Sequence, residues 1–462
     1  MPKTPRAVIT IVLVALAVLL VACVGLFYIG YQLLPAVVQQ AQATPAGQQG
    51  IPGQPSTTGQ GSPAPTGGGG TLRLYGDLPP TLDPALVQDS TSAEYIVHLF
   101  SGLVALDAKL EVVPDLAQNW DVSNNGQRYT FHLRPQATFA DGKPITAQDV
   151  GASIERACSP ALQSPVALTY LGDIVGVAPF ARGETQHISG LQALDEHTVQ
   201  IDIDAPKAYF LAKLTYPTAF VVDTAQIAGQ GQRWMSAPNG SGPLVLSSIS
   251  RDRIVLVRNE RYYGKRPALA HVEFTLSGGT PITMYENNEL DICPVPASDI
   301  ERVLDPENPL HSQYVMAPEL SVDYLGLNLD APPFDDPQQI HNLVLKERAV
   351  PAKGILPPGM PDYTEGLEGL PYDPELARQL LSQSRYAAPG AMPKIVLAIS
   401  GTSGYMPPVT EAILDMVKQN LGLDITVEQV EWSYFLRDLN QQRYQLFESG
   451  WIADYPDSEN FL

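Results

Sequence analysis

The side chains that could do chemistry are scattered along the 462 residues and form no known catalytic pattern. The sequence contains no G-x-S-x-G nucleophile motif, no H-E-x-x-H zinc motif, no phosphate-binding P-loop and no G-x-G-x-x-G after a strand. None of the seven histidines has a partner at metal-ligand spacing, and the three cysteines form no C-x-x-C pair. We therefore expect a protein that binds rather than catalyses, without a metal or a cofactor.

Two pairs of carboxylates leave a hydrolytic function open. Asp335 and Asp336 are neighbours in a turn-like segment, and Asp454 and Asp457 lie three residues apart near the end of the sequence. Two carboxylates can act as general acid and general base. Because Asp is also a common turn residue, we interpret the first pair as solvated surface groups and rank the hydrolase last.

The charge distribution argues against a nucleic-acid partner and divides the chain into two parts. There are 28 Lys and Arg residues against 49 Asp and Glu residues, a net charge of −21, whereas a nucleic-acid binder needs a surplus of basic groups. Residues 1–70 contain Lys3 and Arg6 and no acidic residue. Residues 71–462 therefore carry 26 basic and 49 acidic side chains, a net charge of −23.

An uncharged apolar stretch over residues 7–34 predicts a membrane-spanning helix. The two basic residues before it place residues 1–6 in the cytoplasm and the bulk of the chain outside the membrane. An alternative is a lipoprotein signal, because Leu20-Val21-Ala22-Cys23 resembles a lipobox in which Cys23 would be lipidated. Apolar sequence continues past Cys23, so we favour the uncleaved anchor; both alternatives tether an extracytoplasmic domain to a membrane.

Residues 35–70 form a linker dominated by Pro, Gly, Gln, Ser and Thr from residue 41 on. Such a composition cannot bury enough apolar surface to order itself, so we expect a flexible spacer.

Residues 71–462 show the alternating strand and helix patterns of a mixed α/β protein. A strand begins at Thr71, and Thr146 with Asp149 predicts the start of a helix that runs to about Arg156. Apolar spacing predicts further helices over residues 92–106, over 410–421, where Gly422 ends the helix, and from 433. Strands are expected over residues 122–133, with a turn at 124–126, and over 194–203, 272–276, 323–328 and 425–430, the strand 323–328 being buried. A hairpin-like pair of strands is expected over 245–258, around residues 251–253.

Several segments in the same order resemble the signature of the family 5 extracellular solute-binding proteins, the peptide-binding components of ABC importers. They are PDLAQNW (114–120), YTFHLR (129–134), FADGKPITAQDV (139–150), GSGP (240–243), RNERYY (258–263), ELDI (289–292) with Asn288 where the family has Gly, Asn328 with PFDDP (333–337), and GWIADYPD (450–457). The resemblance covers about residues 71–462.

The resemblance implies an α/β fold of the periplasmic-binding-protein-like type II class, with two lobes joined by a hinge and preceded by the transmembrane helix. Lobe 1 would span residues 71–290 and include an extra subdomain at about 107–190. Lobe 2 would span residues 291–462.

The resemblance also implies a ligand site. Asp454 holds the place of the Asp that faces the ligand's α-ammonium, and a buried cation does need a fixed opposite charge. Trp451 matches the aromatic residue that packs over the bound chain, with a role in the core as the alternative. The main chain at Ile452 and Ala453 would supply strand-like contacts, and Tyr170 would reach the ligand from the smaller subdomain.

Two departures from the family pattern stand out. About a helix's worth of residues is absent after Pro337, and the sequence stops at Leu462, directly after the ligand segment. These departures suggest a truncated or frame-disrupted copy that lacks the C-terminal return to lobe 1, and they put its binding competence in question.

The expected function is therefore capture of peptides and their delivery to an ABC permease with its ATPase subunits. The expected location is the cell membrane, with the binding domain in the periplasm or on the cell surface. Alternatives on the same fold are a nickel complex, an oligosaccharide or an opine as ligand, or an anchored surface or sensor protein. Retention of Asp454 favours a ligand that bears an amine.

Overall fold

The computed structural model describes residues 69–461, except 297, 318, 329, 335–353, 368–372, 389 and 402–405. The predicted anchor at 7–34, Cys23 and the pair Asp335 and Asp336 lie outside the described residues. Within the described ranges no helix has the length and apolarity that crossing a bilayer requires.

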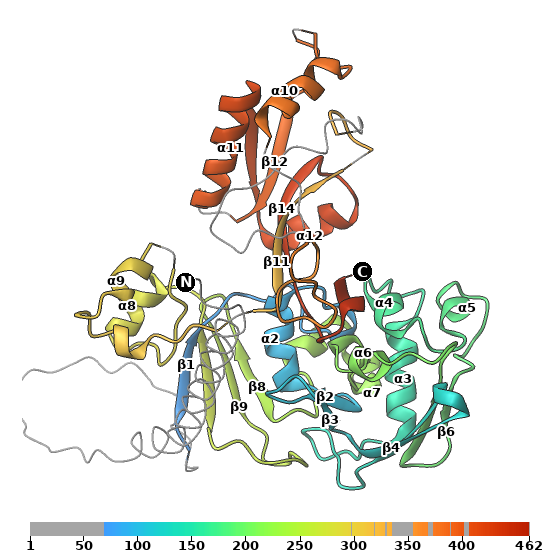
Figure 1. Cartoon of the computed structure of the whole chain (residues 1–462). Helices are drawn as coiled ribbons and strands as arrows, with labels where there is room; N and C mark the ends of the chain where they lie inside the picture. Colours follow the sequence, from blue (N-terminus) through green and yellow to red (C-terminus); the bar gives the residue numbers. More distant parts are fainter. Residues whose placement is uncertain are drawn as a thin grey trace, which may run out of the picture. The chain divides into compact units, whose positions relative to one another are not determined.

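The first sheet has the strand order β1-β10-β9-β8 and is built from segments far apart in the sequence (Figure 1). Its strands are β1 (Thr71–Tyr75), β8 (Leu244–Ile249), β9 (Arg253–Arg258) and β10 (His271–Thr275). β1 pairs parallel with β10 and the other pairs are antiparallel. Helix α2 (Ser90–Leu99) packs against β8.

The second sheet is antiparallel, in the order β4-β5-β7-β6. Its strands are β4 (Ala117–Ser123), β5 (Arg128–Leu133), β6 (Leu191–Ala193) and β7 (Thr198–Asp202), and a two-stranded ladder of β2 (Val104–Leu106) and β3 (Val112–Pro114) precedes it. Asn124 and Asn125 turn the chain between β4 and β5 with positive φ, a conformation that Asn tolerates.

Several helices connect and flank these two sheets (Figure 1). They are α3 (Ala147–Ala157), which packs against β6 and β7, α4 (Ala167–Leu171), α5 (Val177–Ala181), α6 (Phe210–Lys213), α7 (Thr224–Gln230), α8 (Pro281–Glu286) and α9 (Ile300–Leu304). Both sheets share one hydrophobic core, whose largest buried side chains include Tyr95, Phe100, Phe131, Phe139, Phe210 and Phe274.

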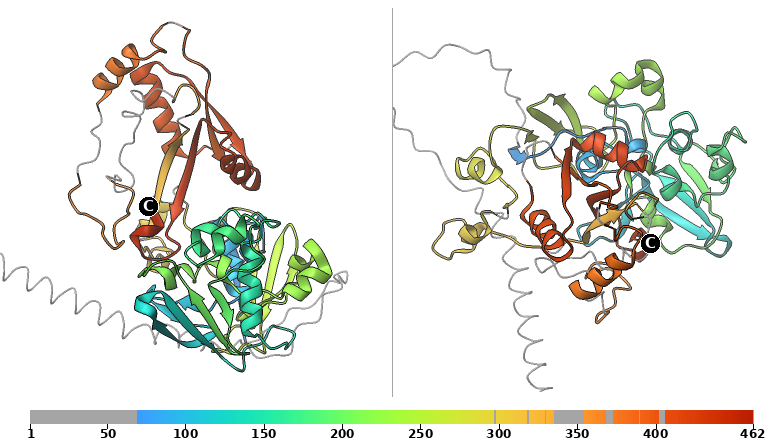
Figure 2. Two further views of the ribbon diagram at one scale, coloured as in Figure 1. Left: turned by 90° about the vertical axis from the view of Figure 1, so that its right-hand side faces the viewer. Right: turned by 90° about the horizontal axis from the view of Figure 1, so that it is seen from above.

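The third sheet has the order β11-β14-β12-β13 and a hydrophobic core of its own. Its strands are β11 (Ser321–Leu327), β12 (Ile395–Ser400), β13 (Ile425–Val430) and β14 (Leu446–Ile452). Helices α10 (Pro374–Gln383) and α11 (Pro408–Leu421) pack against each other, and α12 (Trp432–Asn440) packs against β12 (Figure 2). The described residues thus contain two separate cores, one per group of sheets, while the exact lobe and subdomain boundaries stay a prediction.

Three sequence predictions about elements were wrong in part. The helix expected over 92–106 ends at Leu99, because the backbone beyond it bonds to distant segments: Ser101 N–H donates to Ser241 Oγ at 3.1 Å and Ser101 O accepts from Val221 N–H at 3.0 Å. Only β7 (Thr198–Asp202) of the strand expected over 194–203 is formed. The residues before it make the hairpin turn between β6 and β7, in which Asp195 accepts a hydrogen bond from His197 N–H. The strand over 323–328 exists, but the side chains of Asp323 and Tyr324 are exposed rather than buried.

The structure explains the residue type at one position in each of two motif segments, Gly240 and Asn288. A Cβ atom on Gly240 would lie 1.9 Å from Leu99 O, so only glycine lets this segment approach the end of α2. Asn288, which replaces a family glycine, has a φ of 60°, a value that Asn adopts more readily than most residues. The Arg73 guanidinium donates to the Asn288 carbonyl oxygen at 2.6 Å and pairs with Asp291 at 2.7 Å. This turn is thereby attached to β1.

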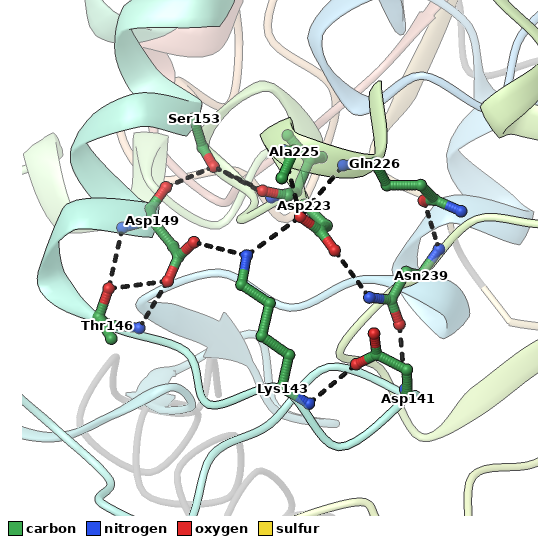
Figure 3. A network of polar contacts seen from close by, with 10 residues as sticks. Asp141, Lys143, Thr146, Asp149, Ser153, Asp223, Ala225, Gln226 and Asn239 are labelled. Carbon is green, nitrogen blue, oxygen red and sulfur yellow. Dashed lines mark hydrogen bonds and ion pairs between the residues drawn. The ribbon is translucent and has the colours of Figure 1, made fainter. Parts of the chain in front are cut away.

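A polar network joins the starts of α3 and α7 (Figure 3). The Lys143 ammonium lies 3.2 Å from Asp149 Oδ1 and 3.1 Å from Asp223 Oδ1, and Asn239 Nδ2 donates to Asp223 Oδ2 at 2.8 Å. Thr146 and Asp149 form the predicted capping box: Thr146 Oγ1 accepts from Asp149 N–H, and Asp149 Oδ2 accepts from Thr146 N–H. The block 139–150 therefore fixes the start of α3, from which the chain continues to α4.

Replacing Thr146 by valine is expected to lower the free energy of unfolding by about 1 kcal/mol, because α3 loses the hydroxyl that caps it. Urea unfolding followed by circular dichroism measures the loss. The matched control is Thr426→Val, which removes an exposed hydroxyl from strand β13 and should leave stability within about 0.5 kcal/mol of the native value. Equal effects of the two substitutions would contradict a capping role.

Candidate functional site

The end of strand β14 and the two residues after it carry most of the predicted site residues. β14 is antiparallel to β11, with Ser321 opposite Ile452, and parallel to β12. Gly450 lies opposite Asp323, where a Cβ atom would come within 2.6 Å of the Asp323 carboxylate. After Ile452 the chain leaves the sheet and forms a 3₁₀ helix, η7 (Ser458–Phe461).

Tyr170 is positioned by a short turn that leads into helix α4. Ser164 Oγ donates to Ala85 O at 2.5 Å and accepts from Ala167 N–H at 3.1 Å, so one hydroxyl attaches the start of α4 to the loop before α2. The Tyr170 ring is buried and stacks on the Tyr216 ring, with centroids 3.7 Å apart and an interplanar angle of 1°. The attachment of α4 through Ser164 and the stacking on Tyr216 therefore fix the direction of the Tyr170 phenol.

The Tyr170 hydroxyl donates a short hydrogen bond to Asp454 Oδ2, across 284 positions of sequence. Burial, together with the neighbouring Tyr216 and Asp454, raises the pKa of Tyr170 above that of a free phenol, so this group is a neutral donor. Burial also raises the pKa values of Tyr216 and Tyr455, with the Asp454 carboxylate adding to both effects. The tertiary structure thus brings together two of the residues that the family resemblance selected.

Asn460 completes the surroundings of Asp454 and was not predicted from the sequence. Its Oδ1 accepts from Trp451 Nε1 at 3.1 Å and from Asp454 N–H at 3.0 Å, and its Nδ2 donates to Asp454 Oδ2 at 3.2 Å. One side-chain amide therefore connects both predicted ligand side chains of this segment.

Burial raises the pKa of Asp454 above the usual value for a carboxyl, although the hydrogen bonds from Tyr170 and Asn460 lower it in part. Both hydrogen bonds that its side chain accepts within the described part of the chain end on Oδ2. Oδ1 accepts no hydrogen bond from the described residues.

The other predicted residues of this segment differ in what they can offer. Trp451 is 38% exposed and Ile452 is 43% exposed, so neither belongs to a core. The Ala453 N–H donates to Leu320 O at 2.8 Å, so that group is already engaged within the protein. The ligand roles of Tyr170, Trp451, Ile452, Ala453 and Asp454 remain predictions.

The residues after Asp454 attach this segment to the first core. The Tyr455 ring is buried in that core, and its hydroxyl donates to Glu459 Oε2. Lys213, whose side chain is 5% exposed, pairs with Glu459 at 2.8 Å and with Asp173 at 3.2 Å. Its pKa is raised, because these two carboxylates outweigh the effect of burial. The candidate site is therefore held on both sides of Asp454.

The geometry around Asp454 bears on two other kinds of site, a hydrolytic acid pair and a metal site. Asp457 Oδ1 accepts from Glu459 N–H at 3.0 Å, whereas the carboxylate of Asp454 bonds to Tyr170 and Asn460, so no hydrogen bond joins the two acids of the proposed hydrolytic pair. In the described ranges, no three His, Cys, Asp or Glu side chains are arranged to hold a metal ion.

The sequence model of the bacterial extracellular solute-binding proteins, family 5, matches residues 111–462, which is most of the chain and includes the β14 segment. The chain belongs to this family. Family 5 members are solute-binding proteins, and the fold is the two-lobed α/β fold of periplasmic binding proteins.

Relatives of this family 5 protein include periplasmic binding proteins. The oligopeptide-binding protein OppA of Escherichia coli is 28% identical over 421 residues, which cover 85% of this chain and 76% of OppA. The probable deoxycholate-binding periplasmic protein YgiS of E. coli is 29% identical over 409 residues, covering 83% of this chain and 75% of YgiS. The crystal structure of the oligopeptide-binding protein OppAIV of Borrelia burgdorferi has a TM-score of 0.75 and 27% identity, and covers 85% of this chain and 81% of OppAIV.

Proposed function

We propose that this family 5 protein captures peptides outside the cytoplasmic membrane and delivers them to an ABC permease with its ATPase subunits. The observation that carries the proposal is the half-buried Asp454 carboxylate, which two donors hold by Oδ2 while no described residue donates to Oδ1. The oligopeptide-binding relatives support a peptide as the ligand.

The charges near Asp454 favour an ammonium group as its partner. A carboxylate removed from water is costly unless a cation or several donors compensate it. Lys213, which binds Glu459 in the segment after Asp454, is also paired with Asp173, and Lys207 is paired with the same Asp173 and with Asp204. A peptide's α-ammonium would supply the missing positive charge, and Trp451 with Ile452 would offer exposed apolar surface beside it.

The finer features of this proposal come from the sequence. Residues 7–34 would anchor the protein, residues 35–70 would let the binding domain move, and Cys23 is the alternative lipid attachment point. The lobes would be of the type II class, with the extra subdomain of lobe 1 contributing Tyr170. The periplasmic relatives support an extracytoplasmic location.

Isothermal titration calorimetry of the full-length chain in mild detergent tests the proposal, with a library of two- to five-residue peptides and the same library N-acetylated. We expect binding of the free peptides and at least a tenfold weaker affinity for the acetylated ones, because acetylation removes the charge that Asp454 would bind. Equal affinity for both libraries would refute the ammonium role, and absence of binding by either library would refute peptide capture.

The YgiS relative motivates one further arm of the same titration, with deoxycholate as the ligand. Deoxycholate is an anion without an amine, so the Asp454 carboxylate should repel it. Binding of deoxycholate in place of peptides would assign the site to a different class of solute. Mass spectrometry of the titrated peptides checks for hydrolysis products.

A further inference from the structure

We propose that Asn460 presents Asp454 Oδ1 to the ligand's ammonium group and is thereby a positioning residue for ligand selection. This inference rests on the proposed capture of peptides by their amino terminus. Asn460 lies six positions after Asp454 and would reach the ligand only through its neighbours.

The orientation of the Asn460 amide is set by its partners. Two N–H groups, from the Trp451 indole and the Asp454 backbone, converge on one atom at 3.1 and 3.0 Å, so that atom must be the oxygen. The other atom lies 3.2 Å from a carboxylate oxygen of Asp454 and must be the NH₂ group. The rotated amide would place a donor against two donors and an oxygen against a carboxylate.

This arrangement distinguishes the two oxygens of the Asp454 carboxylate. Oδ2 receives the Tyr170 hydroxyl and the Asn460 amide, which leaves Oδ1 to accept from a ligand. The same amide fixes the Trp451 indole, which is 38% exposed, relative to that carboxylate. An ammonium group at Oδ1 would therefore meet a carboxylate and an aromatic side chain held in one arrangement.

The ionisable groups that face Asp454 leave its charge for the ligand. Tyr170, Tyr216 and Tyr455 interact with the carboxylate as neutral phenols, since their pKa values all lie above 10. Lys213 of helix α6, which binds Glu459 in the segment after Asp454, is also paired with Asp173. The lower limb of a pH profile of binding should therefore report the titration of Asp454.

The test substitution is Asn460→Asp, which keeps the size of the side chain and an oxygen for the two N–H groups. It places a second carboxylate oxygen against Asp454 Oδ2, and like charges at this distance favour protonation of one of the two acids. Titrations of the full-length chain with tri-alanine and N-acetyl-tri-alanine are run from pH 5 to pH 8.5. The charge-matched control is Asn125→Asp in the exposed turn between β4 and β5, where positive φ suits either residue.

We expect Asn460→Asp to move the lower limb of tri-alanine binding to higher pH and to weaken binding at pH 6 by at least tenfold, with partial recovery at pH 8. Asn460→Ala removes all three contacts and should weaken tri-alanine binding at every pH while changing N-acetyl-tri-alanine binding less than twofold. Asn125→Asp should match the native profile.

An unchanged lower limb in Asn460→Asp, together with normal tri-alanine affinity, would overturn the positioning role and leave peptide capture intact. A purely structural role would lower the melting temperature and weaken both peptides equally in Asn460→Ala, which also overturns the proposal. Absence of tri-alanine binding by the native chain would overturn the function on which the inference rests.

Discussion

Replacing Asp454 by asparagine is expected to weaken binding of amino-terminated peptides by about 100-fold, equivalent to about 3 kcal/mol. Asparagine has the same shape, and its oxygen can still accept the hydrogen bonds that reach Oδ2 from Tyr170 and Asn460. The substitution therefore removes the negative charge and places an NH₂ donor where Oδ1 would accept from the ligand, while the contacts at Oδ2 are kept. Calorimetric titration with tri-alanine measures the loss.

The pH dependence of peptide binding should differ between the native chain and Asp454→Asn. Because the pKa of Asp454 is raised, the native chain should lose peptide affinity as the pH falls through that raised value, whereas Asp454→Asn should show no such limb. Without ligand, the pH dependence of folding stability has the opposite sign to the pH dependence of peptide affinity. Between the ordinary pKa of a carboxyl and the raised one, the folded state holds the proton more tightly than the unfolded state, so the native chain loses stability relative to Asp454→Asn as the pH rises.

The matched control is Asp457→Asn, which makes the same chemical change three residues further on. Asp457 accepts a hydrogen bond from Glu459 N–H and none of those around Asp454, so its substitution should change affinity less than threefold. Equal losses in Asp454→Asn and Asp457→Asn, or undiminished binding in Asp454→Asn, would rule out the specific ammonium contact.

Replacing Arg156 by methionine is expected to lower the free energy of unfolding by about 3–5 kcal/mol, the usual cost of breaking a buried ion pair from one side. Arg156 binds Asp83 through the two terminal guanidinium nitrogens, Nη1 and Nη2, at 2.9 and 2.5 Å, and the two side chains are only 17% and 4% exposed. Methionine keeps much of the apolar stem but leaves the Asp83 carboxylate buried without its counter-ion. Asp83 begins the loop that carries Ala85, which in turn holds the turn before α4 and Tyr170.

Urea unfolding of the full-length chain, followed by circular dichroism, measures this loss. Arg182→Met is the matched control, since Arg182 pairs with Glu184 in the same bidentate way but with side chains 60% and 54% exposed. Exposed pairs contribute at most about 1 kcal/mol. If Arg156→Met lowers the free energy of unfolding no more than Arg182→Met does, the buried pair with Asp83 contributes no more to stability than an exposed pair.

Local features of the fold could be predicted from short stretches of sequence. The capping box at Thr146 and Asp149, the Asn124 turn and the end of α11 at Gly422, where φ is 68°, all depend on residues within a few positions of one another. Each was confirmed, since the groups that satisfy a helix end or a turn are supplied by the same short segment.

Features that depend on distant partners were missed or placed only in part. The helix of residues 92–106 stops at Leu99 because segments near residues 221 and 241 bind the backbone of Ser101, and no periodicity within the helix reveals those partners. The strand of residues 194–203 was misjudged for a local reason, because the hairpin turn at Asp195 also fits an alternating pattern.

For the candidate site, the sequence by itself determined the family through motifs in the right order. It selected Asp454 and Trp451 through the motif 450–457, and Tyr170 only as an implication of the family resemblance. Only the tertiary structure decided how they act together: Tyr170 reaches Asp454 Oδ2, Tyr216 stacks beneath Tyr170, and Asn460 ties the carboxylate to the Trp451 indole. The physical reason is that a motif records residue types along the chain, whereas the charge and direction of a carboxylate depend on burial and on donors brought from elsewhere in the fold.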